Sequence, residues 1–96
     1  MMSNIKLVML KTGENLVGDT SKGVDIVIIV NPLLMIPISQ QQFGFAEYLQ
    51  FTDEHILYLD SSDVRGIYEP KENIANYWNQ HYGSGIITPT QKLITE

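Results

Sequence analysis

The sequence contains no cysteine. This absence excludes disulfide bonds, thiolate nucleophiles and thiolate-ligated metal sites, and it suits a reducing cytoplasm. Basic residues are also few: six Lys and Arg stand against eleven Asp and Glu, for a formal net charge of −5. Because neutralisation of phosphates supplies most of the affinity for nucleic acid, these scattered cations argue against binding to duplex DNA.

A long uninterrupted apolar segment is missing as well. The apolar stretch over residues 24–38 is broken by Asp25, Asn31, Pro32 and Pro37, and it falls short of the ~20 residues that a membrane span needs. Residues 7–10 form a short apolar stretch directly after Lys6, which does not fit a secretory signal. We therefore expect a soluble cytoplasmic protein that does not bind a membrane.

No set of catalytic or metal-binding residues stands out. His55 and His81 are the only imidazoles, and neither has a second ligand at the spacing of a zinc site. The cluster of Asp and Ser at residues 60–63 is ordinary turn chemistry, and no histidine is placed beside it as a base. We predict a protein that is not an enzyme and has no cofactor and no metal site.

The size indicates one small domain. A chain of 96 residues, 44% of them hydrophobic, buries roughly 65% of its unfolded surface on folding. We expect a single barrel domain over residues 1–83, followed by a tail at residues 84–96 that is flexible or docks on a sheet edge.

The first half of the chain reads as strands and turns. Residues 5–11 and 14–20 alternate in polarity around a turn at Gly13. Gly18, inside the second strand, predicts a bulge or a sharp bend. Residues 24–30 are nearly all β-branched, as in a strand covered on both faces, and Asn31-Pro32 ends or kinks that strand before residues 33–38 continue as an extended edge.

The second half adds strands over residues 43–51, 55–59 and 64–68, then a helix over about 70–82 opened by Pro70 and stopped by Gly83. The apolar stripe of this helix consists of Ile74, Tyr77, Trp78, His81 and Tyr82. Its aromatic rings are either core residues packed over the sheet or a stacking platform for bases.

Together these elements predict a mainly β fold: a small, strongly bent, five- or six-stranded antiparallel open barrel with one C-terminal helix. An open barrel leaves unpaired strand edges, and few lysines or prolines protect them here. We expect identical chains to pair these edges and form a homo-oligomeric ring. The residues predicted for the inter-protomer edges are Phe45, Tyr48, Leu49, Val64 and Tyr68. The alternative is a monomer whose tail covers its own edge.

Two short motifs resemble those of the Sm-like (LSm) family of ring-forming barrels. Gly13-x-x-Leu16-x-Gly18 matches the first motif, and Val64-Arg65-Gly66 is similar to the apolar-Arg-Gly of the second. Proteins of this family bind single-stranded RNA at the pore, through an Asp-x-x-x-Asn pair and the Arg of Arg-Gly. The resemblance therefore implies RNA-binding roles for Asp25, Asn31, Arg65 and Gly66.

The sequence also departs from the family pattern. Asp25 lies one residue late, and the position four beyond it is Ile29, so that the nearest asparagine is Asn31. The turn at residues 60–63 also competes for the place of the second motif's loop, and that alignment puts Arg65 inside the last strand, away from the pore. Arg65 then has two readings: a reader of phosphate or bases, or an ion-pair partner of Asp63 or Glu69.

The order of short segments along the chain (Lys-Thr-Gly-Glu, Asn-Pro, Leu-Tyr-Leu and Ile-Tyr-Glu-Pro before a Tyr-rich helix) is similar to that of small Sm-like proteins from tailed phages that infect marine cyanobacteria. This resemblance would place the protein in a host cytoplasm. We therefore predict a non-enzymatic Sm-like ring-forming protein that binds single-stranded RNA or scaffolds a ribonucleoprotein. The alternative is a protein–protein interaction module of a phage that does not bind nucleic acid.

Overall fold

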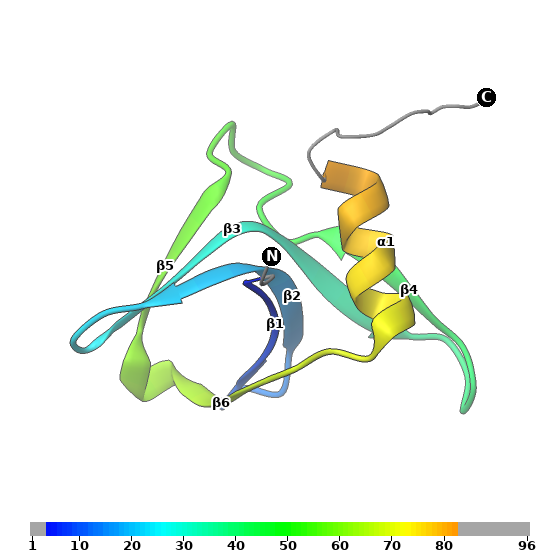
Figure 1. Cartoon of the computed structure of the whole chain (residues 1–96), viewed down its shortest axis with the longest axis horizontal. Helices are drawn as coiled ribbons and strands as arrows, with labels where there is room; N and C mark the ends of the chain where they lie inside the picture. The colour runs from blue at the N-terminus through cyan, green and yellow to red at the C-terminus, as the bar shows by residue number, and fades with distance from the viewer. Residues whose placement is uncertain (1–3, 83–96) are drawn as a thin grey trace.

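A computed structural model describes residues 4–82, which form six antiparallel strands and one C-terminal helix (Figure 1). The elements are β1 (Ile5–Leu10), β2 (Asn15–Lys22), β3 (Ile26–Pro37), β4 (Phe43–Glu47), β5 (Ile56–Asp60), the 3₁₀ turn η1 (Ser61–Asp63), β6 (Val64–Tyr68) and α1 (Glu72–Tyr82). The predicted fold class is confirmed: the molecule is mainly β, with a strongly bent open sheet and a helix at its end, consistent with a small Sm-like fold.

The sheet is a single curved path with two ends. Its order is β4-β3-β2-β1-β6, and β5 pairs with β3 beside β4. The long strand β3 therefore has two partners in series: β4 along Leu33 to Pro37 and β5 along Ile26 to Val30. Each of β4, β5 and β6 has one strand partner among the described residues, so the sheet is open at both ends.

Two residues produce the bend of the central strands. At Gly18 the pairing of β2 with β3 shifts register, and an added Cβ would lie 2.5 Å from Cγ2 of Ile29 and 3.0 Å from the carbonyl oxygen of Val30. Only glycine fits this approach of two backbones. On β3, Asn31 adopts a left-handed conformation with a φ of 53° just before Pro32. Both the bulge at Gly18 and the kink at Asn31 were predicted.

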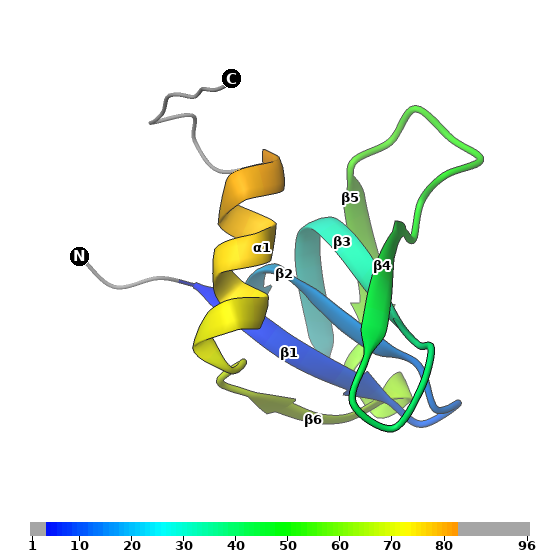
Figure 2. The ribbon, with the colours of Figure 1, turned by 90° about the vertical axis from the view of Figure 1, so that its right-hand side faces the viewer.

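The core has two parts because the central strands are covered on both faces. Inside the curve lie Val8, Leu10, Leu16, Val27 and Ile29. On the outer face, α1 contributes Ile74 and Trp78 to a cluster with Ile5, Val17 and Leu33. Figure 2 shows α1 standing over this face beside β1 and β2. The predicted core role of the helix is thus confirmed for Trp78, while Tyr77 stays 41% exposed.

The kink at Asn31 bends β3 without ending it, so that residues 26–37 form one strand. Two other predicted boundaries were wrong. The predicted strand over residues 43–51 stops at Glu47, and residues 48–55 leave the sheet and project beyond its end (Figure 2). The helix begins at Glu72, so Pro70 lies before it; the carbonyl of Lys71 is the first to accept helical N–H groups, from Ile74 and Ala75.

The predicted tail at residues 84–96 lies outside the described residues. Within residues 4–82, no helix has the length and apolarity needed to cross a membrane.

Candidate nucleic-acid interface

The turn η1 joins the two ends of the curved sheet. The amide of Ser61 donates a hydrogen bond to the carbonyl of Asp25, in the β2–β3 turn (3.1 Å), and the amide of Lys11, in the β1–β2 turn, donates to the carbonyl of Asp63 (3.0 Å). Three segments that are distant in sequence therefore meet at one corner of the molecule. This corner, which we call the turn corner, contains residues 11, 22–25 and 60–66.

A side-chain cap holds η1 in place. The carboxylate of Asp60 accepts a hydrogen bond from the amide of Ser62 (2.9 Å). This bond favours the charged carboxylate and lowers the pKa of Asp60 from its ordinary value of 3.8. The cap gives the Asp and Ser residues of this turn a role in holding its backbone conformation.

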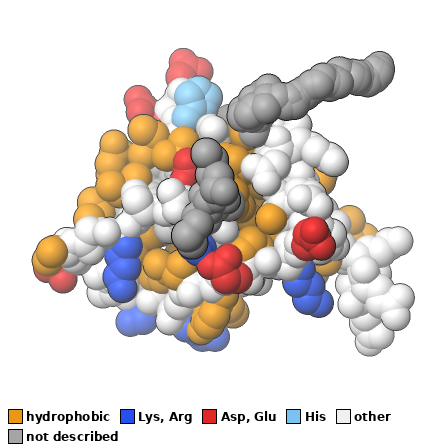
Figure 3. Space-filling view, in the orientation of Figure 1, with side chains coloured by type: hydrophobic (Ala, Val, Ile, Leu, Met, Phe, Trp, Pro, Cys, Tyr) orange, Lys and Arg blue, Asp and Glu red, His pale blue; other side chains and the backbone are white. Residues whose placement is uncertain are grey.

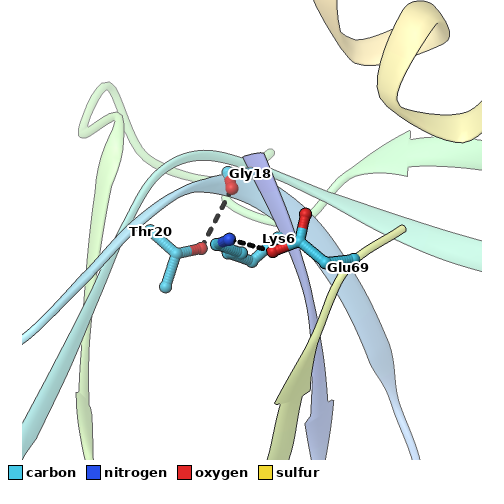
Figure 4. Close-up of polar contacts among 4 residues, drawn as sticks. All are labelled: Lys6, Gly18, Thr20 and Glu69. Atoms are coloured by element: carbon cyan, nitrogen blue, oxygen red, sulfur yellow. Dashed lines mark hydrogen bonds and ion pairs between the residues drawn. The ribbon is translucent and has the colours of Figure 1, made fainter. Parts of the chain in front are cut away.

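Arg65 is an exposed residue of β6, immediately after this turn. Residues 61–63 form the turn, and Arg65 lies within β6. The ion-pair reading of Arg65 is wrong for the described residues, since neither Asp63 nor Glu69 pairs with it. Glu69 instead pairs with Lys6 of β1, as Figure 4 shows beside the bond from the Thr20 hydroxyl to the Gly18 carbonyl (2.9 Å).

The turn corner carries a cavity of about 260 Å³. Its lining consists of Lys22, Val27, Ser61, Val64, Arg65, Gly66 and Ile67. Two cationic side chains thus line one cavity together with apolar residues. Figure 3 shows Lys and Arg side chains gathered at the lower left of the visible face, where η1 and β6 lie in Figure 1.

The predicted RNA-binding residues do not form one group. Asp25, Arg65 and Gly66 belong to the turn corner, whereas Asn31 lies at the bend of β3. The carbonyl of Asn31 accepts a hydrogen bond from Nε1 of Trp78 (2.9 Å), and its amide donates to the carbonyl of His55 (2.7 Å). Asn31 therefore connects the bend to α1 and to the β4–β5 segment, and the structure gives it an architectural position.

Gly66 also has a structural reason to be glycine. A Cβ at this position would lie 2.6 Å from ring atoms of Tyr68, which folds back over it. The motif Val64-Arg65-Gly66 thus allows the Tyr68 ring to lie along the face of β6.

The residues predicted for inter-protomer edges divide into two groups. Phe45 is on β4, and Val64 and Tyr68 are on β6, which are terminal strands of the sheet. Tyr48 and Leu49 lie in the turn after β4, not in a strand, because the chain leaves the sheet at Glu47. The ring of Phe45 also packs against α1, since it stacks on the ring of Tyr77 with centroids 4.1 Å apart.

Sequence reasoning did not name β5 as an edge. Ile56 and Tyr58 alternate along it with Leu57 and Leu59, which pack toward the inner core, so Ile56 and Tyr58 are exposed. The period-two alternation was the signal that could have found this edge.

A second, smaller cavity of about 30 Å³ lies between the bend and the end of α1, near Asn31, Glu47, Leu49 and Tyr82. Its volume suits about one water molecule. Burial, and then the nearby Glu47, raise the pKa of Tyr82. Within residues 4–82, no three His, Asp or Glu side chains are grouped to hold a metal ion.

Comparison with known proteins adds no family. No family model matches the chain, and no curated protein matches it either. What stands is the class that the geometry of residues 4–82 defines: a strongly bent, open, mainly β domain whose end strands have no second strand partner among these residues, with a C-terminal helix.

Proposed function

We propose that this protein is a non-enzymatic Sm-like protein that assembles into a homo-oligomeric ring and contacts single-stranded RNA at its turn corner. The observation that carries the assembly is the pair of free edges, one along β4 and β5 and the other along β6. Backbone donors and acceptors of a terminal strand remain open to another strand. A head-to-tail contact between the two different edges closes into a ring when the rotation permits.

The side chains on these strands support the same proposal. Tyr58 on β5 is 62% exposed and Tyr68 on β6 is 52% exposed, and aromatic side chains are enriched at protein interfaces. Neither strand contains a lysine or a proline, although Arg65 lies on β6. The charges on the edge strands are Glu47 at the end of β4, Asp60 at the end of β5 and Arg65 on β6, so the edges lack the lysines and prolines that usually prevent pairing.

The experiment is a mass measurement by light scattering after gel filtration. We expect a multiple of the 10.9 kDa chain, and we expect Tyr58→Lys to shift the mass toward the monomer because a lysine on the edge disfavours pairing. Asn79→Lys, which makes the same substitution on an exposed position of α1, is the matched control and keeps the wild-type mass. A monomeric wild-type chain contradicts the ring.

RNA contact is the second part of the proposal. It is supported by the Sm-like resemblance and by the unpaired Arg65 and Lys22 at the turn corner. The exposed carboxylates of Asp25, Asp60 and Asp63 oppose it at the same corner, so the affinity must come from local contacts and not from overall charge. Titration of labelled oligo(U) at low salt tests it: wild-type protein binds, and Arg65→Ala abolishes binding.

A protein–protein interaction module is the alternative function. It is favoured by apolar side chains that stand exposed away from β5 and β6, above all Phe51, which is 94% exposed in the segment between β4 and β5. If the ring forms and oligo(U) does not bind, this alternative becomes the better one.

A further inference from the structure

We propose that the cavity of the turn corner binds a single phosphate monoester on an apolar or planar body, with a mononucleotide as the fitting size class. The site is made by Lys22 at the end of β2 and Arg65 on β6, together with the partly buried apolar side chains of Val64 and Ile67, which we call its floor. It deepens the RNA-binding part of the proposed function, because Arg65 belongs to both.

The charges around the cavity favour an anion. Neither Lys22 nor Arg65 makes an ion pair with any residue of the described chain, whereas Lys6 is paired with Glu69. No Asp or Glu lines the cavity. The carboxylates of Asp25, Asp60 and Asp63 lie at the same corner and are exposed to solvent, and that of Asp60 accepts the amide of Ser62. Two unpaired cations beside one cavity are notable in a chain whose net charge is −5.

The number of cations favours a monoester over a chain phosphate. A phosphate monoester carries a charge of about −1.5 to −2 at pH 7, while a phosphodiester within RNA carries about −1. The guanidinium of Arg65 offers a planar fork for two phosphate oxygens, and the ammonium of Lys22 offers a point charge. One dianionic group therefore matches the two side chains.

The size and floor of the cavity define the rest of the ligand. A volume of 260 Å³ is just below the usual range of small-molecule sites, about 300–1,000 Å³. It has the size of one small unit. The partly buried side chains of Val64 and Ile67 line the cavity and offer an apolar surface to a flat ring.

The test is a titration of the full-length protein with uridine 5′-monophosphate, uridine and inorganic phosphate, followed by amide chemical shifts. We expect saturable binding of the monophosphate with shifts at Ser61 and Gly66, and weaker binding of both uridine and phosphate. Equal affinity for inorganic phosphate and the monophosphate overturns the role of the floor, and equal affinity for uridine overturns the role of the cations.

Variants separate the site from general charge effects. Lys22→Gln and Arg65→Gln should each weaken binding of the monophosphate by about tenfold, the usual effect of losing one charge-assisted hydrogen bond. Arg65→Lys should restore part of it. Lys71→Gln, with the same charge change at an exposed position outside the cavity, is the control and leaves the affinity within about twofold. An equal loss in Lys71→Gln overturns the site.

Oligo(U) distinguishes this inference from the proposed function. If the monophosphate binds and oligo(U) does not, the RNA proposal fails and the cavity stands. If oligo(U) binds in an Arg65-dependent way while the monophosphate does not, the cavity proposal fails and the RNA proposal stands.

Discussion

At the scale of the residue, Gly18 and Gly66, which belong to the two motifs that resemble those of the Sm-like family, have different structural roles. Gly18 lets β2 pass within contact of β3, and Gly66 lets the ring of Tyr68 lie over β6. At both positions, glycine therefore has a structural reason that lies in the packing of the sheet.

Gly18 provides the first prediction. Gly18→Ala places a Cβ against Ile29 and the carbonyl of Val30, and such overpacking costs about 1–3 kcal/mol of the free energy of unfolding. Urea unfolding measures the loss. Gly44→Ala on β4 is the matched control, because its nearest contact is the end of the Ile38 side chain at 3.4 Å, and it changes stability by less than about 0.5 kcal/mol. Equal losses in both variants contradict the close approach at Gly18.

Asp60 provides a pH-dependent prediction. Its pKa is lower in the folded protein than its ordinary value of 3.8, because the carboxylate accepts the Ser62 amide. The folded state thus holds the proton less tightly than the unfolded chain, so the cap stabilises the fold above pH 3.8 and this contribution disappears as the pH falls through the lower folded value. Thermal melting of Asp60→Ala should show a deficit at pH 7 that shrinks toward pH 2.

Asp60→Asn is the control for that experiment, because asparagine also accepts a capping hydrogen bond but does not titrate. It should retain most of the stability at pH 7. A deficit of Asp60→Ala that stays constant from pH 7 to pH 2 would mean that the charged carboxylate is not what stabilises the turn.

At the scale of the element, the helix is attached to the sheet at a defined point. Trp78 packs against Ile5, Val17 and Leu33, and its Nε1 donates to the carbonyl of Asn31 at the bend of β3. One side chain thus joins the helix to the most distorted residue of the sheet. The neighbouring stack of Phe45 on Tyr77 adds a second, more exposed contact with β4.

Trp78→Phe tests this attachment. The substitution removes the donor to Asn31 and part of a buried ring, and we expect a loss of about 1–3 kcal/mol in the free energy of unfolding. Tyr77→Phe keeps the ring that stacks on Phe45 and should change stability by less than about 0.5 kcal/mol. Should the two variants lose the same amount, the helix is not attached mainly through Trp78.

Most elements could be predicted from the sequence, because alternation, turn residues and helical spacing are local signals. The β2 bulge at Gly18 and the kink at Asn31 followed from the same signals. The exit of residues 48–55 from the sheet could not be predicted, because Leu49 and Phe51 continue the apolar period of β4 while the chain itself turns away. The remaining part of β3, residues 26–30, pairs with β5 and not with a continuation of β4. A local sequence pattern cannot show this long-range pairing.

The candidate site was predictable only in part. Asp25 and Arg65 were named from motif spacing, and the structure places both at the turn corner. The role of Lys22 beside Arg65 depends on the way η1 joins the sheet ends, which is a long-range feature. Asn31 was assigned to RNA as the nearest asparagine in sequence, which could not show that its backbone bonds to Trp78 and His55 at the bend.

At the scale of the whole molecule, the open sheet raises the question of where its stability comes from. The turn η1 joins β5 to β6, but these two strands are not paired with each other, and Tyr58 and Tyr68 are exposed. A small domain of this size has a modest core of its own. Assembly would add burial at the free edges, so folding and association are coupled in the proposed ring.

This coupling predicts a melting temperature that depends on protein concentration. Association stabilises the folded chain by mass action, so a hundredfold increase in concentration adds up to about 2.7 kcal/mol per chain. For a domain of this length, that corresponds to a rise of up to roughly 10–20 °C. Calorimetry over this range measures the rise. Tyr58→Lys, which disfavours pairing at β5, should melt at the same temperature throughout, while Asn79→Lys should follow the wild type. A wild-type melting temperature that is independent of concentration would mean that each chain is stable alone and that its free edges do not contribute to its folding.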